Sequence, residues 1–376
     1  MVKVLGSKPF HLITDQGEVL DGCSGSMNVN LGHRHPAILN AVRSSAEATP
    51  YVKRGSFETN ESSVISAKLE NLLPPRFEKV LFGVTGSDGI ETALRLAWMA
   101  NARRRRSESP VILTDCISYH GMTTGALVMS GHPTRRKSLG AVDGILAPTV
   151  IRVGSALGDR RATSDEWEAA IEQYSERAAA IVIEPVGGAS SGAMVLDQST
   201  QATVRAKASA FSIPIIADEV MTGLGRSGSM LASERYLKPD VVVLSKGLGV
   251  GQAAISAVAV AGPVLKLLPN QDDLGAFGHT MASSPFAFAV ASSAIDVVVN
   301  DDLPAYAMGL GDVLRMYLDE VASQFEFLDS TRGVGLQLGI PVRGFHPMRL
   351  RDELVSIALQ NGLHVYPAGV SDGSAS

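Results

Sequence analysis

Short apolar runs rich in valine and isoleucine alternate with longer segments of helical period through the middle of this 376-residue chain. Such alternation is typical of a mostly parallel sheet whose strands are joined by crossover helices. Because the runs are continuously apolar, we expect the strands to be buried on both faces. The predicted strands span residues 79–82, 111–114, 180–184, 213–218, 241–245 and 255–261. The predicted helices span residues 87–105, 164–176, 199–211 and 284–299.

The two ends of the chain differ from its middle. Residues 10–22 predict a β-hairpin that turns at Asp15, Gln16 and Gly17. Towards the other end the sequence predicts a helix at 303–323, a strand at 334–340, a helix at 349–361 and a short strand at 363–366. We therefore predict an α/β fold with a large domain at residues 51–301. A smaller α+β domain would combine residues 1–50 with residues 302–376.

Composition excludes several classes of protein. With 45% hydrophobic residues the chain has enough apolar side chains to exclude disorder, and a formal charge of −5 argues against a nucleic-acid-binding protein. The two cysteines, Cys23 and Cys116, are too few for a disulfide framework and favour a reducing compartment. No targeting segment or long apolar run is present. We expect a soluble cytoplasmic protein without membrane or nucleic-acid partners.

Charged residues stand where three apolar strands are predicted to end: Glu184, Asp218 and Lys246. Ligands of parallel sheets bind beyond the carboxyl ends of the strands. One interpretation is an ion pair that ties neighbouring strands together, because buried charges need partners. In the other, Lys246 is a nucleophilic amine that forms a Schiff base with a carbonyl, and Asp218 holds the protonated ring nitrogen of a pyridoxal cofactor.

A phosphate site is indicated by residues 85–89, Thr-Gly-Ser-Asp-Gly, between a predicted strand and a predicted helix. Backbone N–H groups at a helix N-terminus bind anions. The alternative is ordinary helix capping by Ser87 or Thr85, with Glu91 as the partner.

Two other patterns are less favourable as ligand sites. Residues 223–228 match G-x-G-x-x-G, but residues 218–222 stand between the apolar run of the preceding strand and the first glycine, which disfavours a dinucleotide site. The eight histidines show no H-x-x-x-H spacing, and residues 33–36, His-Arg-His-Pro, are interpreted as a loop. No metal site is predicted.

Taken together, these segments resemble the class III (omega) aminotransferases, pyridoxal-phosphate enzymes of fold type I. The resemblance extends over about residues 12–369. Its motifs are residues 20–25 and 31–36, residues 85–88 with Glu91, residues 118–121, 184–186, 216–223 and 239–249, and residues 278–280 with Pro285.

The resemblance implies roles for individual residues. Lys246 would carry the cofactor as a Schiff base and then move a proton, while Asp218 would keep the ring nitrogen protonated. The ring would lie between Tyr119 and Val220. The phosphate would be bound by Gly86, Ser87 and Thr280, the last from the other subunit, so the family implies a homodimer with shared active sites. His120 and Glu184 belong to the matched cofactor-binding motifs.

Three departures from the family pattern bear on the substrate. Met221 stands where many members have glutamine, and residues 187–190, Gly-Gly-Ala-Ser, lack a glutamate that acts on substrate carboxylates. The C-terminal arginine that binds an α-carboxylate in the family is absent, and nothing in the sequence places Arg332 or Arg343 in the site. As a hypothesis, the mouth of the site is open enough for a bulky or carrier-bound substrate.

The expected activity is the transfer of an amino group between an amine or amino acid and a ketone or aldehyde. An aminomutase, epimerase or decarboxylase of the same fold is the alternative, because Lys246 and Asp218 serve all of these reactions. A cofactor-free binding protein is a further alternative, against which the presence of both residues argues.

Overall fold

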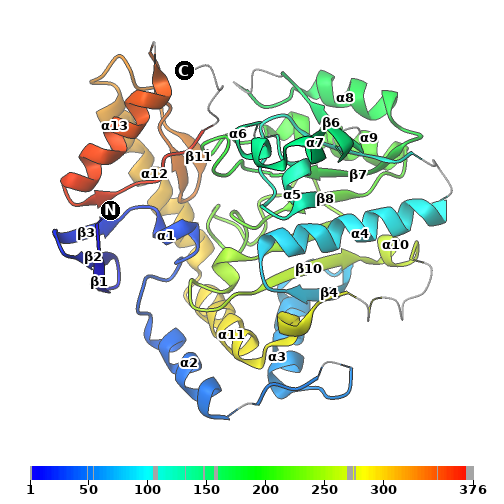
Figure 1. Ribbon diagram of the computed structural model, residues 1–376, viewed down its shortest axis with the longest axis horizontal. Helices are drawn as coiled ribbons and strands as arrows, with labels where there is room; N and C mark the ends of the chain where they lie inside the picture. Colours follow the sequence, from blue (N-terminus) through cyan, green and yellow to red (C-terminus); the bar gives the residue numbers. More distant parts are fainter. Residues whose placement is uncertain are drawn as a thin grey trace.

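A seven-stranded sheet forms the centre of the computed structural model (Figure 1), which describes residues 2–48, 50–53, 55–104, 109–131, 133–146, 149–155, 160–268, 274, 277–344 and 346–369. The strand order is β4-β10-β9-β8-β7-β5-β6. The strands are β4 (Phe77–Gly83), β5 (Val111–Asp115), β6 (Val150–Val153), β7 (Ala178–Ile183), β8 (Ile215–Asp218), β9 (Val241–Leu244) and β10 (Ser256–Ala261). Of these seven strands, only β10 is antiparallel to its neighbours, β4 and β9, so the predicted, mostly parallel sheet is confirmed.

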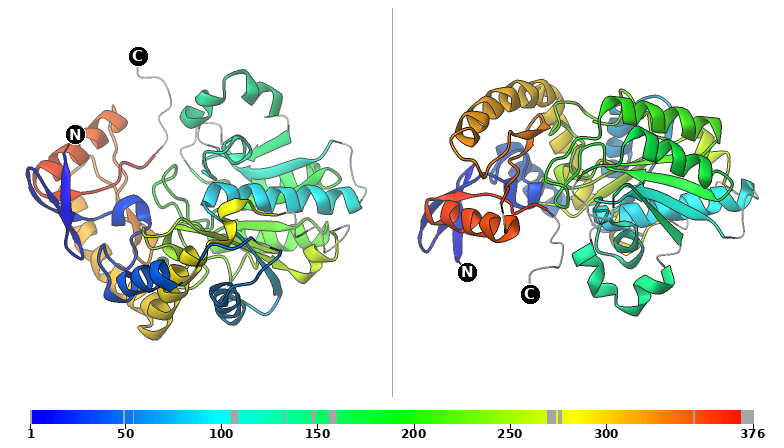
Figure 2. Two further views of the ribbon diagram at one scale, coloured as in Figure 1. Left: turned by 60° about the horizontal axis from the view of Figure 1, so that its bottom comes forward. Right: turned by 90° about the horizontal axis from the view of Figure 1, so that it is seen from above.

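Helices cover both faces of this sheet (Figures 1 and 2). One face packs against α3 (Asn60–Leu72), α8 (Ser164–Gln173), α9 (Gln198–Ala210) and α11 (Pro285–Asn300). The other packs against α4 (Gly86–Arg104), α5 (Thr124–Met129) and α10 (Gly262–Leu265). Every residue of β5, β7, β8, β9 and β10 is buried, as their continuous apolar runs predict.

A second sheet joins segments from the two ends of the chain. Its order is β1 (Val4–Ser7), β2 (His11–Thr14), β3 (Gly17–Asp21) and β13 (Leu363–His364), and β13 runs parallel to β3. The hairpin predicted at 10–22 is therefore present as β2 and β3. Helices α12 (Leu303–Ala322) and α13 (Pro347–Gln360) lie in the same part of the molecule (Figure 1). The domain boundaries stay a prediction, and residues 370–376 lie outside the described residues.

The strand predicted at 334–340 is wrong. The chain instead forms a small hairpin of β11 (Arg332–Val334) and β12 (Gln337–Gly339). Gly335 turns the chain with a φ of 56°, and a Cβ there would lie 2.6 Å from the Arg226 carbonyl oxygen. Close backbone contact therefore breaks the extended run into two strands.

Several elements of the structure have no counterpart in the sequence-based prediction. They are β1, α1 (Ser24–Met27), α2 (Pro36–Ala48), α3, α5, β6, α6 (Pro133–Arg136), η1 (Lys137–Leu139), α7 (Ala141–Leu146), α10, η3 (Lys246–Leu248) and η5 (Thr280–Ser283). Among the described residues, none of the helices has both the length and the hydropathy needed to cross a membrane.

Candidate active site

The carboxyl edge of the sheet brings the predicted charged residues together. Asp218 ends β8, Glu184 follows β7 and Lys246 lies two residues beyond β9. Asp218 is buried, and its Oδ2 lies 2.8 Å from Nδ1 of His120. The second carboxylate oxygen, Oδ1, accepts a hydrogen bond from the Val220 N–H at 3.1 Å. A carboxylate can accept about four hydrogen bonds, so Asp218 retains capacity for one more donor.

His120 is held in place by several hydrogen bonds. Its Nε2 lies 3.1 Å from Thr114 Oγ1, and its backbone N–H donates to Ser130 Oγ at 2.9 Å. The ring is completely buried, with Nδ1 directed at Asp218. Thr114 in β5 therefore positions His120, and His120 positions the carboxylate of Asp218.

Glu184 organises backbone around the same edge. Its Oε2 accepts from the Tyr119 N–H and its Oε1 from the Gly188 N–H, both at 2.9 Å. Burial raises the pKa of the Glu184 carboxyl, the positive character of His120 opposes this, and the nearby Asp218 charge adds to it. Glu184 therefore holds the loop before His120 and the loop after β7 in one arrangement.

Lys246 is half-buried and occupies a strained backbone position, with a φ of 38°. Burial lowers the pKa of its ammonium group. The charges of Asp218 and Glu184 oppose that shift, while Arg226 and Arg135 reinforce it. These surroundings thus shift the balance of this amine towards its neutral, nucleophilic form.

The electrostatics of Lys246 predict a pH effect. The Glu184 charge raises the pKa of Lys246, so Glu184→Gln should lower that pKa further. The rate at which cofactor-free protein captures pyridoxal phosphate should rise with pH. The pH at which this rate reaches half of its maximum, the midpoint, should be lower in the variant than in the wild type. Stopped-flow absorbance at a series of pH values measures this. The control is Glu166→Gln, which removes a partly exposed carboxylate on α8 and should leave the midpoint unchanged. An unchanged midpoint in Glu184→Gln would show that the Glu184 charge does not affect the pKa of Lys246.

The N-terminus of α4 carries the predicted phosphate loop. Thr85 does cap the helix, but its partner is Asp88 rather than Glu91: Asp88 N–H donates to Thr85 Oγ1, and the Thr85 N–H donates to Asp88 Oδ1. Glu91 instead accepts hydrogen bonds from Gly125 and Ala126, at the start of α5. The choice of Glu91 as capping partner is therefore wrong.

Capping leaves two donors of this loop available. Among the described residues, no acceptor lies in hydrogen-bonding reach of the Gly86 or Ser87 N–H. A Cβ at position 86 would lie 2.9 Å from both γ-methyl groups of Val220, so only glycine fits there. Ser87 Oγ accepts from the Met122 N–H at 3.1 Å. A helix dipole, N–H groups and a hydroxyl gathered in this way are suited to binding an anion, and we call residues 86–87 the cradle.

The remaining predicted residues lie around this cradle. Tyr119 is half-buried, and the guanidinium carbon of Arg135 lies 4.3 Å from the centre of its ring. Thr280 is exposed at the start of η5. Its neighbour His279 places this segment beside the phosphate loop, since His279 Nε2 lies 2.8 Å from Asp88 Oδ2. No hydrogen bond of the described residues joins the Thr280 side chain to the cradle.

Three residues of the site escape the sequence-based prediction: Thr114, Arg135 and Arg226. Thr114 is a polar residue inside an apolar strand, a signal that could have revealed it. Arg226 lies in the glycine-rich segment that resembles a dinucleotide motif; burial lowers the pKa of its guanidinium to about 10. Nothing in the sequence connects Arg135 to Tyr119.

The C-terminal segment reaches the rim of the site. Gly369 N–H donates to the Ala189 carbonyl at 2.9 Å, in the loop that follows Glu184. Arg332 occupies its donors on the carbonyls of Ser191 and Gly192 in the same loop. These contacts join the C-terminal segment to the loop that follows β7, and the open mouth stays a prediction. Arg343 is exposed and paired with Asp329, so it does not belong to the site.

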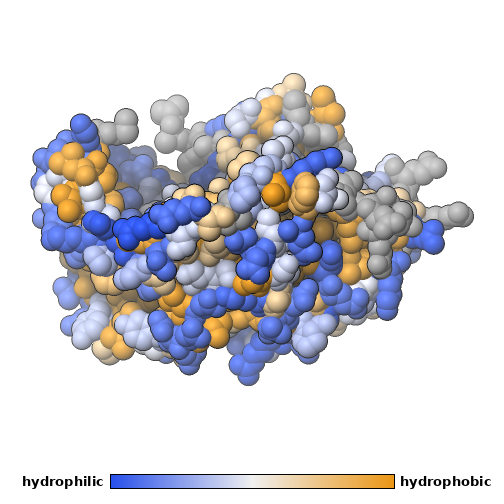
Figure 3. All heavy atoms as spheres, turned by 90° about the horizontal axis from the view of Figure 1, so that it is seen from below, coloured by the Kyte–Doolittle hydropathy of each residue, from blue (hydrophilic) through white to orange (hydrophobic). Residues whose placement is uncertain are grey.

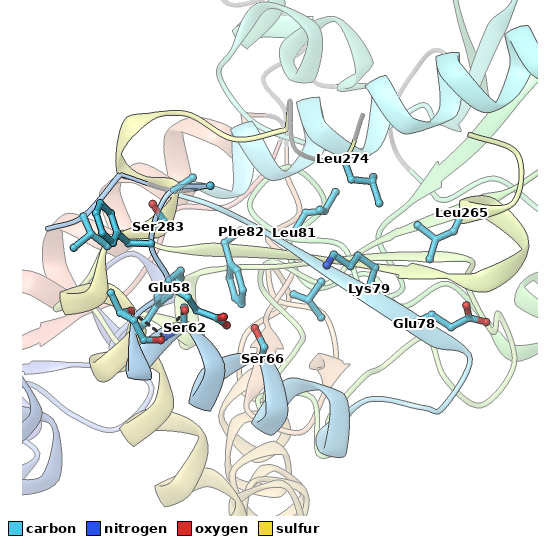
Figure 4. A pocket seen from close by; sticks show the side chains of 17 residues that line it. Glu58, Ser62, Ser66, Glu78, Lys79, Leu81, Phe82, Leu265, Leu274 and Ser283 are labelled. Carbon is cyan, nitrogen blue, oxygen red and sulfur yellow. Dashed lines mark hydrogen bonds between the residues drawn. The ribbon is translucent and has the colours of Figure 1, made fainter. Parts of the chain in front are cut away.

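A separate cavity of about 760 Å³ lies between α3, β4 and η5 (Figure 4). Lys79, Leu81 and Phe82 of β4 point into it, and Ser62 and Ser66 line it from α3. None of the predicted site residues lines this cavity. It therefore lies apart from the residues at the carboxyl edge.

Comparisons with known proteins identify the family of this chain. The family model described as aminotransferase class-III matches residues 11–372. An uncharacterized aminotransferase of Bacillus subtilis, YodT, is 31% identical over 372 residues, covering 94% of this chain and 84% of its own. The mitochondrial ornithine aminotransferase of Arabidopsis thaliana is 32% identical over 313 residues, covering 82% of this chain and 62% of its own.

Solved structures show the same fold. A thermostable omega transaminase engineered for asymmetric synthesis of enantiopure bulky amines matches with a TM-score of 0.90 and 24% identity, covering 98% of this chain and 87% of its own. The taurine:2-oxoglutarate aminotransferase of Bifidobacterium kashiwanohense, in complex with PLP and glutamate, matches with a TM-score of 0.87 and 21% identity, covering 97% and 85%. The chain belongs to the class III aminotransferases, enzymes that use pyridoxal phosphate to transfer amino groups.

Proposed function

We propose that Lys246 is the amine that carries pyridoxal phosphate as a Schiff base and that Asp218 is the partner of its ring nitrogen. The observation that carries this proposal is a half-buried lysine with a lowered pKa, at the same sheet edge as a carboxylate held by His120. We also propose a cytoplasmic location, because both cysteines are free thiols, as a reducing compartment favours.

The residues present fit the cofactor. The Gly86–Ser87 cradle suits its phosphate, Val220 and Tyr119 offer apolar and aromatic surface to its ring, and Asp218 has an acceptor site left for the ring N–H. The chemistry that pyridoxal phosphate supplies when bound is an aldehyde that condenses with amines and a ring that withdraws electrons from the substrate Cα.

The chain supplies proton transfer and electrostatics. Lys246 Nζ would take the proton from the substrate Cα in its neutral form, towards which burial shifts it. Asp218 keeps a proton on the ring nitrogen, and His120 and Thr114 hold the carboxylate in position. Asp218 and His120 are buried at the ends of apolar strands, and low polarity around them strengthens the interaction between them.

For the substrate, we propose an amino acid or other carboxylate-bearing amine that binds Arg135. This guanidinium faces the Tyr119 ring and contributes positive charge at Lys246. Arginine is suited to bidentate binding of carboxylates. The names of the ornithine aminotransferases among the relatives agree with an amino-acid donor.

A paired panel of donors tests this function. Each amino acid is compared with the amine that lacks its carboxylate, by following conversion of bound cofactor to its amine form and release of a keto product. Arg135→Ala should lower kcat/KM for the amino acids by about 10–100-fold, the loss of one charge-assisted pair, and change the amines little. Arg343→Ala serves as control. Substrate inversion without keto product would instead favour an epimerase.

We further propose a homodimer with shared active sites. Phe57, 69% exposed, and Met281, 52% exposed, leave apolar surface next to the segment of Thr280, whose carbonyl accepts a hydrogen bond from Tyr51. Exposed apolar side chains gathered in this way are typical of subunit contacts. The face shown in Figure 3 carries hydrophobic residues interspersed with hydrophilic ones.

Co-expression of two inactive variants tests whether each active site contains residues from both subunits. A hybrid of Lys246→Ala and Thr280→Ala chains would contain one complete site, formed by Lys246 of one chain and Thr280 of the partner subunit. The mixed sample should regain about a quarter of wild-type activity, because random pairing yields hybrids in half of the dimers. Activity no higher than the average of the two parent variants would place Thr280 in its own chain's site.

A further inference from the structure

Three different ligand-type side chains meet where the two ends of the chain pair. Asp21 ends β3, Cys23 follows two residues later, and His364 ends β13, directly opposite Asp21 in the parallel register. Their ligand atoms all lie within 4.8 Å of one another. Thiolate, imidazole and carboxylate are the ligands that zinc takes in proteins.

The three atoms form a nearly equilateral triangle. Cys23 Sγ lies 3.4 Å from Asp21 Oδ1 and 3.1 Å from His364 Nδ1, and Nδ1 lies 3.5 Å from Oδ1. Zinc bonds of about 2.3 Å to sulfur and about 2.0–2.2 Å to nitrogen or oxygen place tetrahedral ligands about 3.4–3.6 Å apart. Binding of zinc therefore requires the distance between Sγ and Nδ1 to increase by about 0.5 Å, and the other two distances to change less.

The surroundings orient these ligands. Asp21 Oδ2 accepts from the Gly25 N–H at 2.6 Å and lies 2.8 Å from His33 Nε2, which leaves Oδ1 directed at the cluster. Such outer contacts fix ligand carboxylates in metal sites. The side chains of Asp21 and Cys23 are buried, whereas that of His364 is 35% exposed, so a metal ion could enter from that side and keep a water molecule.

Sγ of Cys23 is a hydrogen-bond donor within this cluster. Burial raises the pKa of Cys23 to about 12, and the Asp21 charge adds to the effect. Sγ lies 3.0 Å from the Gly25 carbonyl oxygen, which accepts the thiol proton and would have to turn away from a thiolate. A bound dication would reverse this balance and displace the proton.

We propose that Asp21, Cys23 and His364 bind one zinc ion, with water as the fourth ligand, and that His33 positions Asp21. The ion would join β13, only two residues long, to β3. The site lies outside the set of residues proposed for amino transfer, so its role is to hold the two ends of the chain together.

The test uses metal-stripped holoenzyme and adds Co²⁺ as a spectroscopic probe and Zn²⁺ for affinity. Tetrahedral cobalt with a thiolate ligand absorbs at the red end of the visible spectrum, where the cofactor does not. We expect one metal per chain and release of one proton per zinc near neutral pH, measured by calorimetry in two buffers. Zinc should also raise Tm.

Variants locate the site. Cys23→Ser and His364→Gln should abolish the cobalt bands and the rise in Tm, and His33→Gln should weaken zinc binding by about 10–100-fold. Cys116→Ser is the matched control, since Cys116 is also a buried thiol, 3.7 Å from Asp115 Oδ1. If Cys23→Ser does not fold, the test depends on His364→Gln, since the His364 side chain is partly exposed and its replacement should be tolerated. Absence of cobalt bands in the wild type, or zinc binding unchanged in His364→Gln, would overturn the proposal.

Discussion

Lys246→Ala is expected to lower kcat by about 10⁴-fold or more. The substitution removes both the amine that anchors the cofactor and the base that moves the substrate proton; proton transfer by a positioned base alone contributes about 10²–10⁴-fold. The loss should persist at saturating cofactor, because the phosphate cradle at Gly86 and Ser87 is left intact. Turnover per bound cofactor, measured with a donor identified in the panel, checks this expectation.

A chemical readout accompanies the kinetics. Borohydride reduction followed by peptide mass spectrometry should find the cofactor on the peptide that contains Lys246 in the wild type, and on no lysine in Lys246→Ala. The matched control is Lys266→Ala, which removes an exposed lysine at the end of α10 and should keep both labelling and turnover. Labelling at another lysine would show that the assignment of Lys246 is wrong.

Asp218→Asn is expected to lower kcat by about 10²–10³-fold while changing KM less. Asparagine keeps the shape of the side chain and can still bond to His120, but it lacks the charge that holds a proton on the ring nitrogen. Loss of one preorganised electrostatic contact of this kind costs about 3–4 kcal/mol in the transition state.

Stability has to be separated from chemistry in this experiment. Asp115→Asn provides the comparison, because Asp115 is also a buried carboxylate at the end of a strand and pairs with Arg161 at 2.7 Å. Both variants should unfold more readily, since each loses a buried charge, but only Asp218→Asn should lose turnover per folded, cofactor-loaded chain. Turnover within a few-fold of wild type in Asp218→Asn would refute the assignment.

Most of the large sheet could be predicted because its strands are fully buried and therefore continuously apolar. Strand β6 escaped prediction because Arg152 interrupts its apolar run. The run at 334–340 looked equally strand-like, but its division at Gly335 depends on contact with the Arg226–Gly228 backbone, which is more than 100 residues away in the sequence. Local pattern does not report contacts of that kind.

In the candidate active site, too, contacts between residues far apart in the sequence could not be predicted. Each charged residue at a strand end could be recognised from its position, but the link between His120 and Asp218 spans 98 residues and depends on the register of neighbouring strands. The cluster of Cys23 and His364 spans 341 residues, so no motif spacing could reveal it. Histidine spacing predicted no metal site, whereas the folded chain supports the proposal of one.

The pairing of β13 with β3 has a consequence for the order in which the protein is made. Leu363 and His364 pair with Leu20 and Asp21, so the N-terminal hairpin leaves the ribosome long before its parallel neighbour has been synthesised. The seven-stranded sheet draws all its strands from residues 77–261 and can assemble earlier. Until translation reaches residue 364, the edge of β3 stays open to pairing with other chains, which makes nascent chains the form most prone to aggregation.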